Sequence, residues 1–340
     1  MIVLAWNGIR SWLRSRRPVH TLAPALKVRV RRIVDETVDI KSFELVSADG
    51  SALPAWSAGA HIDMRLDDET VRPYSLCGAP GARDAYHIAV KNEPDSRGGS
   101  RAMHQRVRVG DTLVIGGPRN HFALVDGARH HVLIAAGIGI TPLFAMVQEL
   151  QARGASYELH YFTRSIAETA FHQVLSAPPY AGGVSFHHAV GGRLRELLRR
   201  LLWQHPPGHH LYMCGPRRFT AVIDDVIAGI WPSEAIHVEY FGADPAAEAA
   251  PNRAFEVKLE RSKRTIAVAA DDSIADALCA HGIDVVTSCR EGVCGTCLTG
   301  VIAGTPDHRD AFLSDKERKA GDKIMICVSR AKSAQLVLDI

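Results

Sequence analysis

Alternation of apolar and polar residues dominates the first third of the chain. Two alternating runs, at 26–34 and 40–46, are joined by a polar turn, and shorter runs follow at 61–66 and 86–91. A period of two places successive side chains on opposite faces of a strand, as in a half-buried sheet. Several such strands with turn residues between them predict an antiparallel barrel or sandwich, which closes near residue 126.

The pattern changes at residue 127. A continuous apolar run at 131–136 is typical of a parallel strand buried on both faces. Leu143, Met146 and Val147 then share one face of a helix, for which Thr141 is the expected N-cap and Pro142 part of the first turn. Further strands and helices alternate as far as residue 242, which predicts a parallel sheet with helices on both sides.

Both ends of the chain differ from these two regions. Residues 243–253 are small, polar and proline-bearing, as in a linker, and 254–340 read as a compact module of short strands and one helix. The apolar run within residues 1–20 is too short to span a bilayer. They could form a basic amphipathic helix on a membrane surface or partner, but a frayed extension is the favoured interpretation.

Composition and charge narrow the class of protein. The chain has 340 residues, 46% hydrophobic and 23% charged, which is typical of a soluble globular protein with two or three domains. Its formal net charge of +3 gives no argument for nucleic-acid binding, which needs a concentrated basic face. Outside a group of four cysteines near the C-terminus, Cys77, Cys214 and Cys279 remain. An odd remainder without a secretory signal favours a reducing, cytoplasmic setting.

Four cysteines carry the most specific motif. Cys289, Cys294 and Cys297 have the spacing C-x4-C-x2-C, and Cys327 follows after 29 residues. This is the plant-type ferredoxin spacing, in which four thiolates hold a [2Fe–2S] cluster. A structural zinc site is the alternative, but zinc sites use matched Cys or Cys/His pairs, which this spacing fits poorly.

A second motif suits a flavin. Arg72, Tyr74 and Ser75 end a predicted barrel strand and offer a guanidinium for phosphate, an aromatic ring and a hydroxyl. The run Gly98-Gly99-Ser100 could form a backbone nest for phosphate oxygens. Taken alone, the first group could be an ordinary strand end and the second a plain turn.

A third motif suits a dinucleotide. Gly137-x-Gly139-x-x-Pro142 lies between the buried strand and its helix, where glycines let a pyrophosphate approach the backbone. The third glycine of the Rossmann fingerprint is missing. Thr163, Arg164 and Ser165 end the next strand where an acidic residue would bind a ribose 2′-hydroxyl, so by charge alone Arg164 tolerates or prefers a 2′-phosphate.

Cys214, Gly215 and Pro216 end another strand, at the edge where parallel sheets bind ligands. A buried, inert thiol is an equally good interpretation of Cys214. The chain has 17 histidines, without metal-ligand spacing, which we interpret as surface and framework residues.

Together, over about residues 26–340, these motifs resemble the phthalate dioxygenase reductase family, which includes vanillate O-demethylase reductases. The resemblance implies a multidomain protein with an antiparallel β-barrel flavin domain, an α/β parallel-sheet nicotinamide domain and an α+β β-grasp ferredoxin domain. The implied boundaries are an extension at 1–24, an FMN domain at 25–126, an NAD domain at 127–242, a linker at 243–253 and a plant-type [2Fe–2S] domain at 254–340.

The resemblance also implies roles for single residues. Catalytic contacts near the hydride path would come from Thr141, Cys214 and Phe241. Cysteines Cys289, Cys294, Cys297 and Cys327 would be the metal ligands. The remaining implied contacts, to FMN first and then to the dinucleotide, are Arg72, Tyr74, Ser75, His87, Ala89, Val90, Gly98, Gly99 and Ser100, then Gly137, Gly139, Thr163, Arg164, Gly215 and Pro216.

The implied activity is an NADH-dependent flavin and iron–sulfur oxidoreductase, with NADPH not excluded. Electrons would pass from NADH through FMN and the [2Fe–2S] cluster to a Rieske non-haem iron oxygenase. Two alternatives stay open: a reductase for another one-electron acceptor such as a cytochrome P450, and a redox sensor that uses the same cofactors without turnover.

Overall fold

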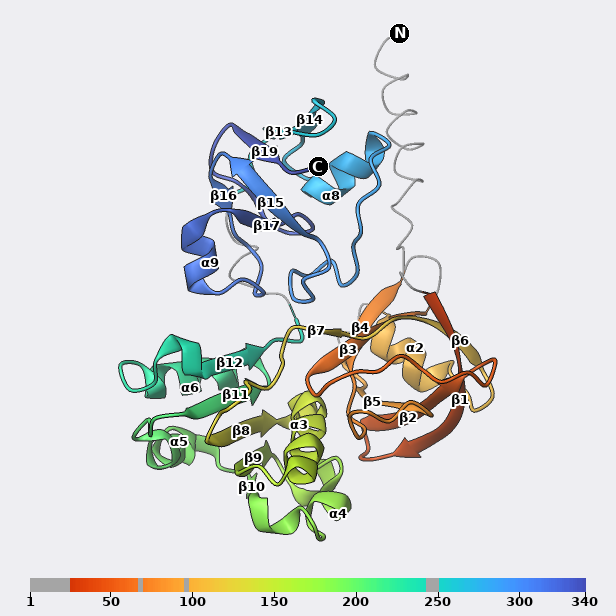
Figure 1. The fold of residues 1–340 in the computed structure, drawn as a ribbon, viewed down its shortest axis with the longest axis vertical. Helices are drawn as coiled ribbons and strands as arrows, with labels where there is room; N and C mark the ends of the chain where they lie inside the picture. Colours follow the sequence, from red (N-terminus) through yellow and green to blue (C-terminus); the bar gives the residue numbers. More distant parts are fainter. Residues whose placement is uncertain (1–24, 67–69, 95–97, 243–250) are drawn as a thin grey trace. The chain divides into compact units, whose positions relative to one another are not determined.

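The computed structural model describes residues 25–66, 70–94, 98–242 and 251–340 (Figure 1). It divides into two compact units, one formed by the described residues of Leu22–Leu66 and Arg72–Phe241, the other mainly by those of Gly242–Ile340. The predicted extension at 1–24 and most of the predicted linker lie outside the described residues. No helix in the described part of the chain is long and apolar enough to cross a membrane.

The first unit begins with an antiparallel sheet in the order β4-β3-β6-β1-β2-β5, with β7 paired to β3. A bridge between Leu76 and Ile88 joins the two outer strands and closes the sheet into a barrel. Along β1, Val28 and Val30 are completely buried while their neighbours face outward, as the period of two predicts. The elements are β1 (Ala25–Asp35), β2 (Ile40–Ser47), β3 (Ala60–Arg65), β4 (Val71–Ser75), β5 (Tyr86–Lys91), α2 (Gly99–Gln105), β6 (Thr112–Gly116) and β7 (Arg119–Asn120).

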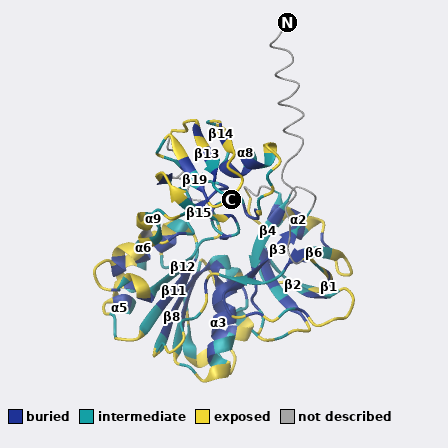
Figure 2. Ribbon diagram, turned by 45° about the horizontal axis from the view of Figure 1, so that its top comes forward, coloured by how far each residue is buried: buried dark blue, intermediate teal, exposed yellow. Residues whose placement is uncertain are grey.

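The same unit continues as a parallel sheet in the order β10-β9-β8-β11-β12. Leu133 of β8 shares a core with α3 on one face, and Ile134 shares a core with α5 and α6 on the other. Figure 2 shows how fully α3 is buried along most of its length. The elements are β8 (His130–Ala136), α3 (Ile140–Arg153), β9 (Tyr157–Thr163), α4 (His172–Leu175), β10 (Val184–His188), α5 (Leu194–Leu202), β11 (His209–Cys214), α6 (Arg217–Ile227) and β12 (Ile236–Glu239).

One local prediction in this unit is wrong. The 3-10 turn η1 (Gly137–Gly139) runs directly into α3, so Gly139 is the N-cap and Thr141 lies inside the first turn. The Thr141 hydroxyl therefore donates back to the Ile138 carbonyl, at 3.0 Å. For the run Gly98-Gly99-Ser100, the structure excludes the alternative of a plain turn, because α2 begins at Gly99.

The second unit is a mixed sheet in the order β14-β13-β19-β15-β17. β13 and β19 are parallel and the other pairs antiparallel. Its helix α8 is capped by Ser273, whose hydroxyl accepts the Asp276 amide at 3.1 Å. The elements are β13 (Phe255–Leu259), β14 (Thr265–Val268), α8 (Ile274–Ala280), β15 (Leu298–Ala303), β16 (Pro306–Asp307), α9 (Asp315–Ala320), β17 (Lys323–Met325), β18 (Arg330–Ala331) and β19 (Gln335–Leu338). The predicted fold class, from barrel to β-grasp module, is confirmed.

Candidate cofactor and electron-transfer sites

The four motif cysteines are buried, with 3–7% of each residue exposed, and their thiols form two pairs. Cys294 is the neighbour that most raises the pKa of Cys289, and Cys297 is the one that most raises the pKa of Cys327, so the four thiols fall into two adjacent pairs. In the described residues, including the cysteine loop, no three His, Cys, Asp or Glu side chains are arranged to bind a single metal ion. Four thiolates shared by two irons give two ligands to each iron, so paired sulfurs fit a [2Fe–2S] group.

Backbone and hydroxyl donors surround these sulfurs. The Glu291 amide donates to the Cys289 sulfur at 3.3 Å, and the Thr296 hydroxyl lies 3.1 Å from the Cys294 sulfur. The neighbouring Cys289 thiol is the main cause that lowers the pKa of Cys294 to about 6, against the effect of burial. Cys294 therefore favours the thiolate, the form that binds a metal, whereas their neighbouring sulfurs and burial raise the pKa values of Cys289 and Cys327.

The cysteine loop is tied to a neighbouring segment by Gly292 and Asp310. Gly292 has φ +71°, and a Cβ there would lie 2.9 Å from the Asp310 Cα. The buried Asp310 accepts the Ser329 hydroxyl at 3.1 Å and the Leu313 amide at 2.8 Å. The Ala311 amide donates to the Gly292 carbonyl at 3.0 Å, and Ser329 stands two residues after Cys327. The segment that begins at Asp310 therefore joins the loop of the first three cysteines to the segment of the fourth.

The predicted flavin group lies at the end of β4 beside the start of α2. A Cβ on Gly99 would lie 2.7 Å from the Arg72 Cγ, so the guanidinium stem lies directly against this glycine. Burial raises the pKa of the neighbouring Tyr74 hydroxyl well above its usual range. The structure thus brings Arg72 together with the Gly98-Gly99-Ser100 run, which the sequence separates by 25 residues or more.

Ser75 joins the barrel to the end of the parallel sheet. Its hydroxyl donates to the Glu239 carboxylate at 3.3 Å. Glu239 lies opposite Cys214 in the pairing of β12 with β11. Burial raises the pKa of Glu239 to about 8, while the Ser75 hydrogen bond opposes that rise. Burial and then Glu239 raise the pKa of the fully buried Cys214 well above its usual value, so this thiol stays protonated.

Glu239→Gln is expected to flatten the pH dependence of thermal stability. The folded-state pKa of about 8 exceeds the ordinary value of 4.5, so the protonated carboxyl contributes stability that is complete below 4.5. That contribution is lost as the pH rises through about 8. Melting temperatures from pH 5 to 8.5 should fall more steeply in the wild type than in E239Q. The exposed Glu234→Gln serves as the control, and parallel wild-type and E239Q curves would contradict the assignment.

The nucleotide turn is close-packed against Cys214. A Cβ on Gly139 would lie 2.1 Å from the Cys214 carbonyl oxygen, and one on Gly215 would lie 2.8 Å from the Ala136 Cβ. Thus Gly139 is required by the approach of two neighbouring strand ends, a reason independent of any ligand. The arrangement gathers Gly137, Gly139, Cys214, Gly215 and Pro216 at one edge of the sheet.

Hydroxyl groups extend this edge to the next two strands. The Thr163 hydroxyl lies 2.9 Å from the His188 Nδ1 and 2.7 Å from the Thr169 hydroxyl. Arg164 is 82% exposed, and its Nη1 lies 3.9 Å from the Glu168 Oε1. Its charge is therefore shared with a carboxylate, which lowers the attraction that Arg164 alone would exert on a 2′-phosphate.

Three predicted flavin neighbours lie differently from the rest. Val90 points into the barrel core and Ala89 is also buried, at 2% and 5% exposure. His87 is half-buried beside Glu44, with 3.6 Å between Nε2 and Oε1. It lines a cavity that does not include Arg72, Tyr74 or Ser75. Phe241 follows β12 and is 43% exposed.

Sequence reasoning missed Glu239, Asp310 and Glu36. Ser75 and Glu239 are 164 positions apart, so no local pattern marks their contact. The single available signal was the position of Glu239 at the end of a strand, on the ligand-binding edge. Glu36 and Asp310 lie in a turn and a loop, where acidic residues are common and carry no specific signal.

Comparisons with known proteins agree with this arrangement. Residues 257–332, which contain all four cysteines, match the 2Fe-2S iron-sulfur cluster binding domain. The vanillate O-demethylase oxidoreductase of Pseudomonas sp. (strain HR199 / DSM 7063) is 44% identical over 304 residues, 89% of this chain and 96% of that protein.

Two solved structures are similar over nearly the whole chain. Phthalate dioxygenase reductase, described as a modular structure for electron transfer from pyridine nucleotides to [2Fe-2S], has a TM-score of 0.69 and 37% identity, covering 94% of this chain and 98% of its own. An intact type IV self-sufficient cytochrome P450 monooxygenase has a TM-score of 0.83 and 38% identity, and this chain (93% covered) spans 41% of that protein. The chain belongs to the family of oxygenase reductases that includes vanillate O-demethylase oxidoreductase and phthalate dioxygenase reductase.

Proposed function

We propose that the chain is the reductase component of a Rieske-type non-haem iron oxygenase and draws its electrons from NADH. The observation that carries the proposal is the set of four buried cysteines with plant-type spacing, in a chain that also holds the barrel and parallel sheet. When bound, FMN would supply the exchange between two-electron and one-electron transfer, and a [2Fe–2S] group held by Cys289, Cys294, Cys297 and Cys327 would supply one-electron transfer to the acceptor.

The chain's own residues position these groups. Arg72 and the Gly98-Gly99-Ser100 run would hold the FMN phosphate, with Tyr74 against the ring and Thr141 and Phe241 near the hydride path. Glu239 accepts the Ser75 proton in a hydrogen bond and so fixes the direction of that hydroxyl. Cys214 stays a neutral, buried thiol, which suits a neighbour of the nicotinamide better than a nucleophile.

The test is spectroscopic and kinetic. Purified protein should absorb as a flavin with an iron–sulfur centre, and NADH should bleach both under anaerobic conditions. Reconstitution with purified Rieske oxygenases should then give NADH-dependent product. Flavin bound without iron, or zinc held by the four thiols, would refute the proposal.

A cytochrome P450 acceptor is the second candidate. The observation in its favour is the self-sufficient P450 monooxygenase, which matches 93% of this chain with a TM-score of 0.83. Pull-down from the native host with the reductase as bait separates the two candidates, because a haem partner and a Rieske partner differ in their spectra. None of the seven cysteines, all of which lie in the described residues, forms a disulfide, which supports a reducing, cytoplasmic location.

Glu168 is expected to favour NADH over NADPH. Its carboxylate shares the Arg164 charge and adds negative charge where a 2′-phosphate would bind. Exposed ion pairs contribute up to about 1 kcal/mol, so Glu168→Gln should raise kcat/KM for NADPH by roughly two- to fivefold and leave that for NADH unchanged.

The control for this comparison is Glu196→Gln, on the exposed face of α5. Arg164→Ala should lower kcat/KM for NADPH alone. Equal proportional changes for both nucleotides in E168Q would show that the 164–168 pair does not face the 2′ position.

A further inference from the structure

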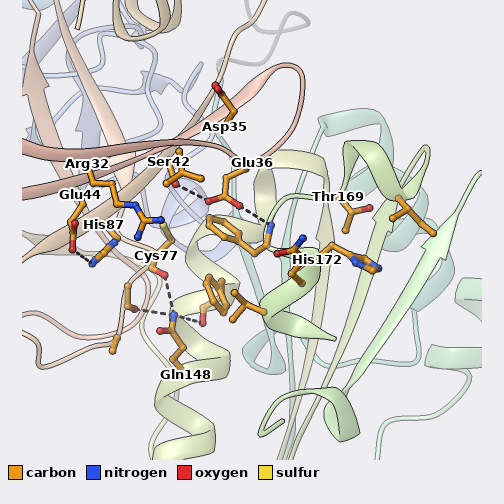
Figure 3. A pocket seen from close by; sticks show the side chains of 18 of the residues that line it. Arg32, Asp35, Glu36, Ser42, Glu44, Cys77, His87, Gln148, Thr169 and His172 are labelled. Carbon is orange, nitrogen blue, oxygen red and sulfur yellow. Dashed lines mark hydrogen bonds and ion pairs between the residues drawn. The ribbon is translucent and has the colours of Figure 1, made fainter. Parts of the chain in front are cut away.

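A carboxylate in the turn between β1 and β2 links the barrel to the parallel-sheet domain. Glu36 Oε1 accepts the Ser42 hydroxyl at 2.7 Å, and Oε2 accepts the Phe171 backbone amide at 3.3 Å (Figure 3). Ser42 belongs to β2, whereas Phe171 ends the segment that follows β9. One side chain therefore ties two halves of the same compact unit together.

The backbone that Glu36 holds is strained. Phe171 has φ 59° and ψ 16°, a left-handed conformation that bulky residues rarely adopt. Its ring stacks on Phe144 of α3, with 4.9 Å between centroids and 29° between planes. Such conformations persist where the surroundings fix them from several sides, and here the amide is fixed by Glu36 and the ring by Phe144.

The held segment leads back to the nucleotide edge. Two residues before Phe171, the Thr169 hydroxyl donates to the Ser165 carbonyl at 2.8 Å and lies 2.7 Å from the Thr163 hydroxyl. Thr163 in turn contacts His188 at the end of β10. The path from Glu36 to Thr163 therefore runs through two side chains and one short stretch of backbone.

A cavity of about 780 Å³ borders this link. Its lining includes Glu36, Phe171, Thr169 and the neighbouring Asp35. Because open space already lies beside Glu36, shortening its side chain removes the link without opening a new void in a packed core. Asp35 offers a matched carboxylate on the same turn, whose partner Lys41 lies in the barrel, 3.7 Å away.

The geometry points to Glu36 as a positioning residue for the dinucleotide. From the flavin barrel, Glu36 holds the 163–171 segment in the conformation that binds the dinucleotide. This inference rests on the proposed function, since 163–165 contacts a nucleotide only if the chain uses NADH. It assigns to the barrel turn a part in nucleotide affinity, in addition to the flavin contacts of β4.

Glu36→Ala should raise KM for NADH about tenfold in dye-linked turnover, the effect of losing one hydrogen bond to a charged group, while kcat stays within about twofold. Glu36→Gln keeps an oxygen that can accept the Phe171 amide, so its KM should return to within about threefold of the wild type. Asp35→Ala should match the wild type. The dissociation constant for 5′-AMP, measured by calorimetry on the holoenzyme, should follow the same order.

Three results would overturn the inference. In the first, E36A and D35A have the same KM and the same affinity for AMP. In the second, E36A loses kcat and thermal stability with KM unchanged, which would indicate a structural role. In the third, the wild type neither oxidises NADH nor binds AMP, which would remove the proposed function as well.

Discussion

Replacing Cys294 by serine is expected to abolish electron delivery to a one-electron protein acceptor and to leave dye-linked NADH oxidation intact. Cys294 forms one half of a buried thiol pair with Cys289, and its low pKa of about 6 favours the metal-binding thiolate. A serine oxygen is a harder and far less acidic ligand. Delivery to the acceptor should fall by roughly a hundredfold or more, since losing even the partners of metal ligands costs about 10–100-fold.

The matched control is Cys279→Ser on α8, a half-buried thiol outside the two pairs. It should retain the iron content, the visible spectrum and both activities of the wild type. Iron analysis, the visible spectrum and reduction of a cytochrome or oxygenase acceptor measure the effect. Undiminished delivery in C294S would show that electrons leave the flavin without passing the cysteine loop.

Features encoded within short stretches of sequence were predictable. The alternation in β1 and β2 and the apolar run of β8 each reflect burial of one element, and the cysteine spacing reflects one loop that must enclose a cluster. In each case the physical constraint acts on neighbours in the chain, so the sequence records it directly. The start of α3 was misplaced because Gly139 could not be recognised as the N-cap of a helix that continues from a 3-10 turn.

Features that depend on packing between distant segments were not predictable. Ser75 meets Glu239 and Glu36 meets Phe171 across 164 and 135 positions, which depends on how the barrel packs on the parallel sheet. Gly139 combines a feature of the local sequence with a constraint from a distant segment. Its position after a buried strand suggested a phosphate turn, but its closest constraint is the Cys214 carbonyl on the neighbouring strand.

Gly139→Ala is therefore expected to impair NADH oxidation strongly. The added methyl carbon would lie 2.1 Å from the Cys214 carbonyl oxygen and 2.4 Å from its carbonyl carbon. Both are backbone atoms of a central strand, so neither can rotate away. Overpacking of this kind costs about 1–3 kcal/mol, and a shift of the 137–141 turn should lower dye-linked kcat/KM for NADH by roughly 10- to 100-fold.

Gly192→Ala is the matched control, because a Cβ there meets no atom within 4 Å and its φ is not positive. The variant should keep wild-type activity and melting temperature. The four cysteines give an internal reference, since they lie in the other compact unit and their iron content and absorbance should be normal in G139A. Normal iron with impaired NADH oxidation would place the damage at the nucleotide turn. Equal activity of G139A and G192A would mean that the turn can move away from Cys214 without loss.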